Sequence, residues 1–124
     1  MRILLVGYEP DAVDFSDPAL PPGLDAEKVR AGITGTLHDM RQRGWTAEHC
    51  LVRPDAAAAG IVAQRLGSAS YDCVVIGAGV RQSRAHLAVF EAILNAVHRA
   101  APGARIAFNT RPEDTAAAVD RVSG

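Results

Sequence analysis

The chain has 124 residues, of which 48% are hydrophobic and 22% charged, and its formal net charge is -1 at pH 7. A chain of this length is expected to form a single domain, residues 1–124, which buries roughly two-thirds of its unfolded surface and needs no disulfide or metal. The small net charge argues against nucleic-acid binding, which requires a basic face. Lys28 is the only lysine, and its charged surroundings give no support to a P-loop or Schiff-base lysine.

Neither the cysteines nor the N-terminus indicates a metal site or a membrane. Cys50 and Cys73 fall in predicted strands without C-x-x-C spacing or nearby histidines, so no metal is expected. Cys73 has apolar neighbours, which predicts a raised thiol pKa and low reactivity. No apolar run approaches the ~20 residues of a membrane span, and the N-terminal run is too short for a signal peptide. We expect a cytoplasmic protein with no membrane partner.

Apolar runs alternate with helical patterns along the chain, as in a sheet whose strands are joined by crossover helices. The first run lacks polar residues and suits a central parallel strand, whereas the second is interrupted by Glu48 and His49 and suits an edge. The predicted strands cover residues 3–6, 46–52, 73–76 and 106–108. The predicted helices cover residues 26–43, residues 56–66, a segment from the end of the 77–84 loop to Pro102, and a last segment that ends near Val122.

Capping residues and glycines refine the predicted helices. Ser83 is expected to cap the third helix, and Thr110 and Glu113 are expected to form a capping box at the start of the last one. Gly32 and Gly35 lower the stability of the first helix unless they allow close packing, so we expect them to pack against the sheet.

Right-handed crossovers would join these elements into a doubly wound parallel sheet of four strands with helices on both faces. We expect the strand order 2-1-3-4, which is flavodoxin-like. The chain then reverses direction between strands 1 and 3, so the loops after these two strands flank one crevice. That crevice is the expected ligand site. Association of copies through an edge strand or a helix face is left open.

The loop after the first strand, residues 8–24, is long and acidic. It contains prolines at positions 10, 18, 21 and 22, whereas strand-to-helix loops commonly have only ~2 to 6 residues. A lid or a recognition surface is one interpretation, and a disordered surface insertion is the other.

Charged side chains from several loops are expected to meet at the crevice. Arg81 and Arg84 beside free helix N–H groups would favour a phosphate or carboxylate, or would instead pair with the acidic loop. The helical pattern turns His86 toward the sheet, where it could act as a general acid or base or could be a half-buried structural histidine. The expected ligand-binding residues are Tyr8, Glu9, Asp11, Arg81, Ser83, Arg84, Asn109 and Arg111.

No cofactor is expected. Gly77-Ala78-Gly79 begins like a dinucleotide-binding G-x-G-x-x-G motif, but Gln82 stands where the last glycine should be, and the motif follows the third strand.

Two resemblances extend this interpretation. Residues 3–7, 13–23, 71–79, 95–102 and 107–115 resemble a family of uncharacterised bacterial flavodoxin-like α/β proteins, over nearly the whole chain. That resemblance implies the fold and no particular activity.

The second resemblance is local and concerns lumazine synthase, which joins a ribityl-aminopyrimidine to a ketose phosphate. Tyr71-Asp72, Gly77-Ala78, Arg81, His86 and Asp114-Thr115 are similar to segments of that family in type and spacing. The resemblance implies a catalytic role for His86. Gln82-Ser83-Arg84 replaces the phosphate loop of that family, and Arg53-Pro54-Asp55-Ala56 replaces the turn after its second strand.

Three functions therefore remain open from the sequence. The first is binding of a small anionic ligand in the crevice. The second is a lumazine-synthase-like or other small-molecule enzyme that uses His86. The third is a protein-interaction module that uses the 8–24 loop.

Overall fold

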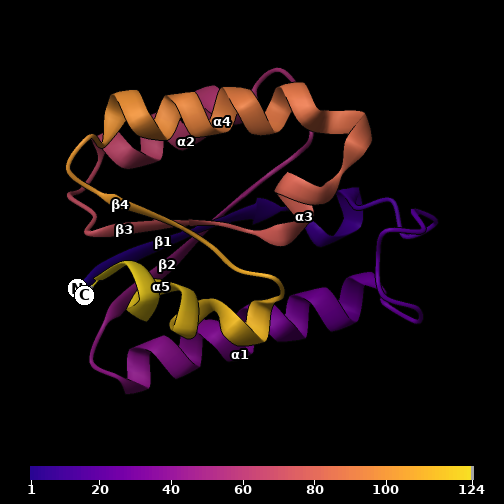
Figure 1. Cartoon of the computed structure of the whole chain (residues 1–124), viewed down its shortest axis with the longest axis horizontal. Coiled ribbons are helices and arrows are strands. Elements are labelled where there is room, and N and C mark those ends of the chain that lie inside the picture. Colours follow the sequence, from indigo (N-terminus) through magenta and orange to yellow (C-terminus); the bar gives the residue numbers. More distant parts are fainter. Residues whose placement is uncertain (124) are drawn as a thin grey trace.

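A computed structural model describes residues 1–123. It contains a four-stranded sheet, all parallel, in the order β2-β1-β3-β4 (Figure 1). The strands are β1 (Arg2–Tyr8), β2 (Thr46–Val52), β3 (Cys73–Ile76) and β4 (Arg105–Phe108). The helices are α1 (Ala26–Gln42), α2 (Ala58–Gly67), α3 (Ala78–Gln82), α4 (Leu87–Ala100) and α5 (Thr115–Ser123), with short 3-10 turns η1 (Pro10–Ala12), η2 (Arg84–His86) and η3 (Pro112–Asp114). The predicted α/β fold and strand order are confirmed.

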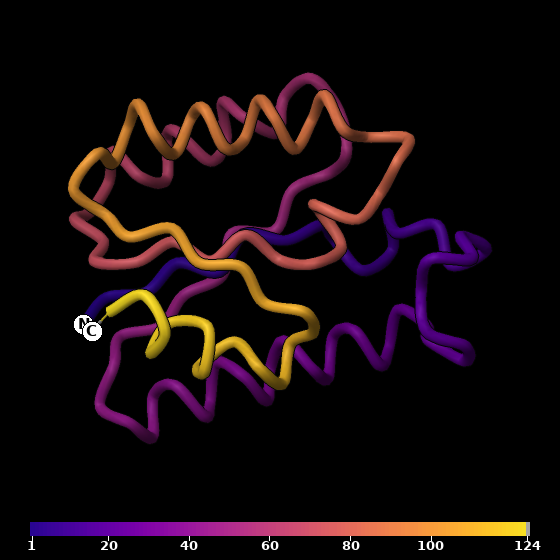
Figure 2. Tube along the Cα trace, in the orientation of Figure 1, coloured from indigo at the N-terminus to yellow at the C-terminus, as the bar shows by residue number. Residues whose placement is uncertain are grey.

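Helices cover both faces of the sheet, with α2 and α4 on one side and α1 and α5 on the other (Figures 1 and 2). Successive side chains of a strand point to opposite faces, so the central strand β1 supplies both cores. Leu4 and Val6 pack with α2 and α4, whereas Ile3 and Leu5 pack with α1 and α5. This two-sided burial explains why β1 and β3 are apolar throughout. In residues 1–123, no helix has both the length and the apolarity needed to cross a bilayer.

The segment after β3 differs from the predicted loop. Residues 78–82 form the short helix α3, which Val80 anchors with a side chain that is 0% exposed. Ser83 follows this helix and makes no side-chain capping bond, so its predicted N-cap role is wrong. A loop was predicted because glycines precede and interrupt the segment, yet one fully buried valine is enough to fold it onto the sheet.

The start of the last helix also differs in detail. The carboxylate of Asp114, not of Glu113, accepts hydrogen bonds from the backbone N–H groups of Thr110 and Arg111. Burial alone would raise the pKa of Asp114, but these bonds and the Thr110 hydroxyl outweigh it and lower that pKa. The capping box therefore exists with its acidic residue one position later than predicted.

Both edge strands have an outward carbonyl that accepts a hydrogen bond from an arginine. On β2, Thr46 and Val52 direct their backbone groups toward β1, so Ala47, His49 and Leu51 direct theirs outward. Arg41 of α1 donates to the Ala47 carbonyl through Nε at 3.2 Å and Nη2 at 2.8 Å. On β4, Nη2 of Arg121 of α5 donates to the Phe108 carbonyl at 2.8 Å.

The two glycines of α1 lie in different surroundings. A Cβ at Gly32 would lie 3.2 Å from two side-chain atoms of Pro112 in η3, whereas a Cβ at Gly35 would meet nothing within 4 Å. The predicted packing role is therefore met at Gly32, although against η3 and not the sheet, and is wrong at Gly35.

Alanine at the two positions should have opposite effects. Gly35→Ala should raise the free energy of unfolding by about 0.5–1 kcal/mol, because alanine restricts the unfolded chain and favours a helix. Gly32→Ala should lower it by about 1 kcal/mol, because the rigid Pro112 ring must move. Urea denaturation of both variants measures the difference, and equal stabilisation by both would contradict the packing described here.

Candidate functional site

The loops after β1 and β3 meet at the carboxyl ends of the strands, but the crevice between them is small. Its volume is about 40 Å³, whereas small-ligand pockets usually have roughly 300–1,000 Å³. Side chains of the acidic loop fill much of the space, including Val13 and Leu20. Of the predicted site residues, Tyr8, Ser83 and His86 line this crevice.

Tyr8 and His86 are neighbours there. Their ring centroids lie 6.3 Å apart in an edge-to-face arrangement with an interplanar angle of 83°. Tyr8 is only 6% exposed, and burial raises the pKa of its hydroxyl. That hydroxyl has no hydrogen-bond partner in residues 1–123. His86 is half-buried, so its ring faces protein on one side and remains accessible on the other.

The guanidinium of Arg81 is occupied by backbone carbonyls. Its Nε donates to the Ile76 carbonyl at 3.2 Å and its Nη2 donates to the Asn109 carbonyl. The carbon Cζ also lies 5.0 Å from the centroid of the Phe108 ring. The acidic loop is paired by another arginine, since Nη2 of Arg53 lies 3.2 Å from Oδ2 of Asp11. Arg81 therefore connects the ends of β3 and β4 and offers few donors to a ligand.

Asn109 is a buried junction between three segments. It is 4% exposed, and its side-chain oxygen accepts the N–H of Ala78 at 2.9 Å. Its amide nitrogen donates to the hydroxyl of Thr115 at 2.9 Å, and that hydroxyl donates to the Pro112 carbonyl at 2.7 Å. Asn109 thus supports the crevice from behind, whereas Arg84 and Arg111 are exposed on the surface.

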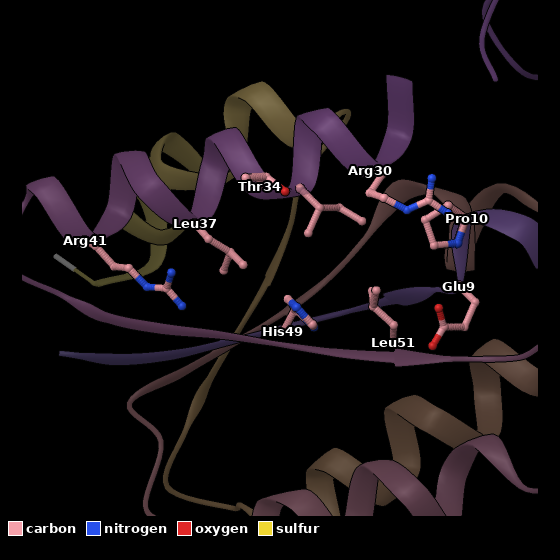
Figure 3. A pocket seen from close by; sticks show the side chains of 9 residues that line it. Glu9, Pro10, Arg30, Thr34, Leu37, Arg41, His49 and Leu51 are labelled. Carbon is pink, nitrogen blue, oxygen red and sulfur yellow. The ribbon is translucent and has the colours of Figure 1, made fainter. Parts of the chain in front are cut away.

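A larger groove lies between α1 and the edge strand β2, where the sequence predicted no site. Its volume is about 320 Å³. Figure 3 shows Arg41 near His49 at one end, Arg30 and Glu9 at the other, and Leu51 between them. Its lining residues are Glu9, Pro10, Arg30, Ile33, Thr34, Leu37, Arg41, His49 and Leu51.

The groove combines an apolar floor with cationic walls. Ile33, Leu37 and Leu51 provide the floor. Arg30 makes no ion pair with any residue of the described chain, and Arg41 has further N–H donors beyond those that bind Ala47. The charged groups that line the groove are thus two arginines and the carboxylate of Glu9, with His49 beside them.

The sequence contained a signal for this groove. Arg30, Thr34, Leu37 and Arg41 recur at helical spacing and share one face of α1. His49 and Leu51 alternate on the face of β2 that packs toward α1. We interpreted the polar residues of β2 only as the mark of an edge strand, and the pairing of these two faces was therefore missed.

Comparisons with known proteins do not identify a family. No protein-family model and no curated protein matches the chain. Within residues 1–123, no three acidic, histidine or cysteine side chains come together as potential metal ligands. The functional argument therefore rests on the geometry of the groove and the crevice.

Replacement of Asn109 tests its supporting role. Asn109→Ala should lower the free energy of unfolding by about 2 kcal/mol or more, because it leaves the N–H of Ala78 and the Thr115 hydroxyl without their partner. Asn95→Ala is the matched control, because Asn95 is exposed and bonds only within α4, and it should change stability by less than about 0.5 kcal/mol. Equal effects in chemical denaturation would contradict the role of Asn109.

The thiol of Cys73 should be unreactive in the native protein. Burial, with a smaller contribution from the charge of Asp72, raises the pKa of Cys73 to about 11. At pH 8 the native protein should therefore leave Cys73 unmodified by a chromogenic disulfide reagent, and both cysteines should react after denaturation. Rapid modification of Cys73 in the folded state, located by peptide mass mapping, would show that β3 opens locally.

Proposed function

We propose that the protein binds a small anionic molecule in the groove between α1 and β2. The observation that carries this proposal is the apolar floor of Ile33, Leu37 and Leu51 with Arg30 and Arg41 beside it in a space of about 320 Å³. Guanidinium groups favour carboxylates and phosphates, which they bind through paired hydrogen bonds. The sequence predicted an anion in the β1/β3 crevice, but the small volume there and the engaged guanidinium of Arg81 favour the groove.

The spacing of the arginines indicates an elongated ligand. Arg30 and Arg41 lie three helical turns apart on α1, which corresponds to roughly 16 Å along the axis at a rise of about 1.5 Å per residue. A ligand with an apolar body and one anionic end would cover Leu37 and Leu51 and place its charge against Arg30 or Arg41. Glu9 lies beside Arg30, so the Arg41 and His49 end is the more favourable place for the anion.

Whether turnover accompanies binding depends on a proton donor near the ligand. His49 lines the groove itself, whereas His86 lies in the separate crevice. A lumazine-synthase-like reaction through His86 is therefore a less favoured proposal. It would require a substrate in a space of about 40 Å³ or displacement of the acidic loop.

The interaction-module hypothesis remains the second candidate, and one observation favours it. Side chains of the acidic loop occupy the crevice near α3, as expected if that loop presents a recognition surface and not a lid. A partner protein would then be captured by residues 10–20 and would be insensitive to substitutions in the groove.

A thermal-shift comparison tests anion binding. Benzoate, hexanoate and phenyl phosphate should raise the Tm of the native protein, and benzyl alcohol should not. A ligand at about 100 times its Kd stabilises the folded state by about 2.7 kcal/mol, which corresponds to a Tm shift of several degrees. Arg30→Gln and Arg41→Gln should reduce the shift, with Arg41→Gln giving the larger loss.

Arg99→Gln is the matched control, because Arg99 is an exposed arginine in the last turn of α4, and it should keep the full shift. The proposal fails if no anion shifts Tm or if all three variants respond as the unmodified protein does. Retention of the shift in Arg41→Gln alone would place the anion at the Arg30 end.

A further inference from the structure

We propose that the crevice beneath residues 10–20 is a second binding site, separate from the groove, and that it takes a primary ammonium group. The crevice is lined by Tyr8 from β1, by Gln82, Ser83 and His86 beyond α3, and by two carboxylates from the acidic loop. It lies at the point where the strand order reverses, between β1 and β3. Open α/β sheets usually bind ligands at such a point.

The hydroxyl of Tyr8 indicates a missing partner. Tyr8 is 6% exposed, and its hydroxyl finds neither a donor nor an acceptor in the described part of the chain. Buried hydroxyl groups are nearly always hydrogen-bonded, because an unsatisfied one loses its bonds to water without replacement. A polar group bound in the crevice would supply the bond that this hydroxyl lacks.

The charge of the crevice selects a cation. Asp14 and Asp17 both line it, and hydrogen bonds from Ser16 lower the pKa of Asp14, so this side chain is ionised at neutral pH. The nearest arginines are engaged elsewhere, since Arg53 pairs with Asp11 and Arg81 donates to carbonyls. An anion would face two carboxylates here, whereas an ammonium would be attracted to them.

Size and hydrogen-bonding capacity both fit an ammonium group. A space of about 40 Å³ accommodates one to about three groups the size of water, which is the size of –NH3⁺ and the carbon that carries it. An ammonium has three N–H donors and no acceptor. The crevice offers oxygen acceptors on Tyr8, Asp14, Asp17, Gln82 and Ser83.

A second tyrosine provides a matched control. Tyr71 is also 6% exposed, and its hydroxyl likewise has no partner within residues 1–123. It precedes β3, at the end of the sheet opposite to the crevice, and Cζ of Arg2 lies 5.3 Å from the centroid of its ring. Removal of either hydroxyl makes the same chemical change, but only one of them lines the proposed site.

NMR titration with methylammonium chloride tests the proposal, with sodium chloride at equal ionic strength as the reference. Methylammonium should shift the ring resonances of His86 and the amide resonances of residues 8–20 in a saturable way. Tyr8→Phe should weaken this binding at least tenfold, and Tyr71→Phe should leave it unchanged. Asp14→Asn should also weaken it, because asparagine keeps the turn to Ser16 but removes the charge.

Three results would overturn the ammonium site. The first is an absence of saturable shifts in the native protein. The second is equal binding of sodium acetate or of neutral acetamide, which would show that the crevice does not select a cation. The third is unchanged affinity in Tyr8→Phe when its spectrum shows a folded protein. Arg41→Gln should bind methylammonium normally, so failure here and failure of anion binding in the groove can be told apart.

Discussion

The arrangement at the carboxyl ends of the strands depends on one buried amide. The side chain of Asn109 holds the first residue of α3 and the first residue of α5, and its own carbonyl receives Arg81. Without that amide, the polypeptide beyond β3 and beyond β4 would have no common point of attachment. The position of His86 against Tyr8 follows from it, because α3 and η2 carry His86 toward β1.

Close approach of β3 and β1 imposes a second constraint at the same place. The N–H of Gly77 donates to the Val6 carbonyl at 2.9 Å, and a Cβ at this position would lie 3.2 Å from that oxygen. Only a residue without a side chain lets the chain turn into α3 immediately beyond the central pair of strands. The crevice is narrow for this reason, because the floor on which the acidic loop rests is backbone against backbone.

The fold could be predicted from the sequence because it depends on apolar runs and on chain chirality, both of which are local or general properties. Four strands and their order follow from the burial of residues such as Val6 and Val75 and from the right-handed crossover. The site could not be predicted to the same degree. Arg81 and Arg41 bind backbone carbonyls, and no sequence pattern distinguishes such an arginine from one that is free for a ligand. Glu9 follows Tyr8 directly, yet it lines the groove while Tyr8 lines the crevice, because neighbouring residues at a strand end face opposite sides.

The arginines that cover the outer carbonyls of β2 and β4 also limit how copies of the chain can join. An uncovered edge is a template on which another strand can add, and repeated addition leads to fibrils. Here a newcomer would first have to displace Arg41 from Ala47 or Arg121 from Phe108. The same contacts that brace each outer helix against the sheet therefore act as end-stops, and they discourage the sheet from growing beyond its four strands.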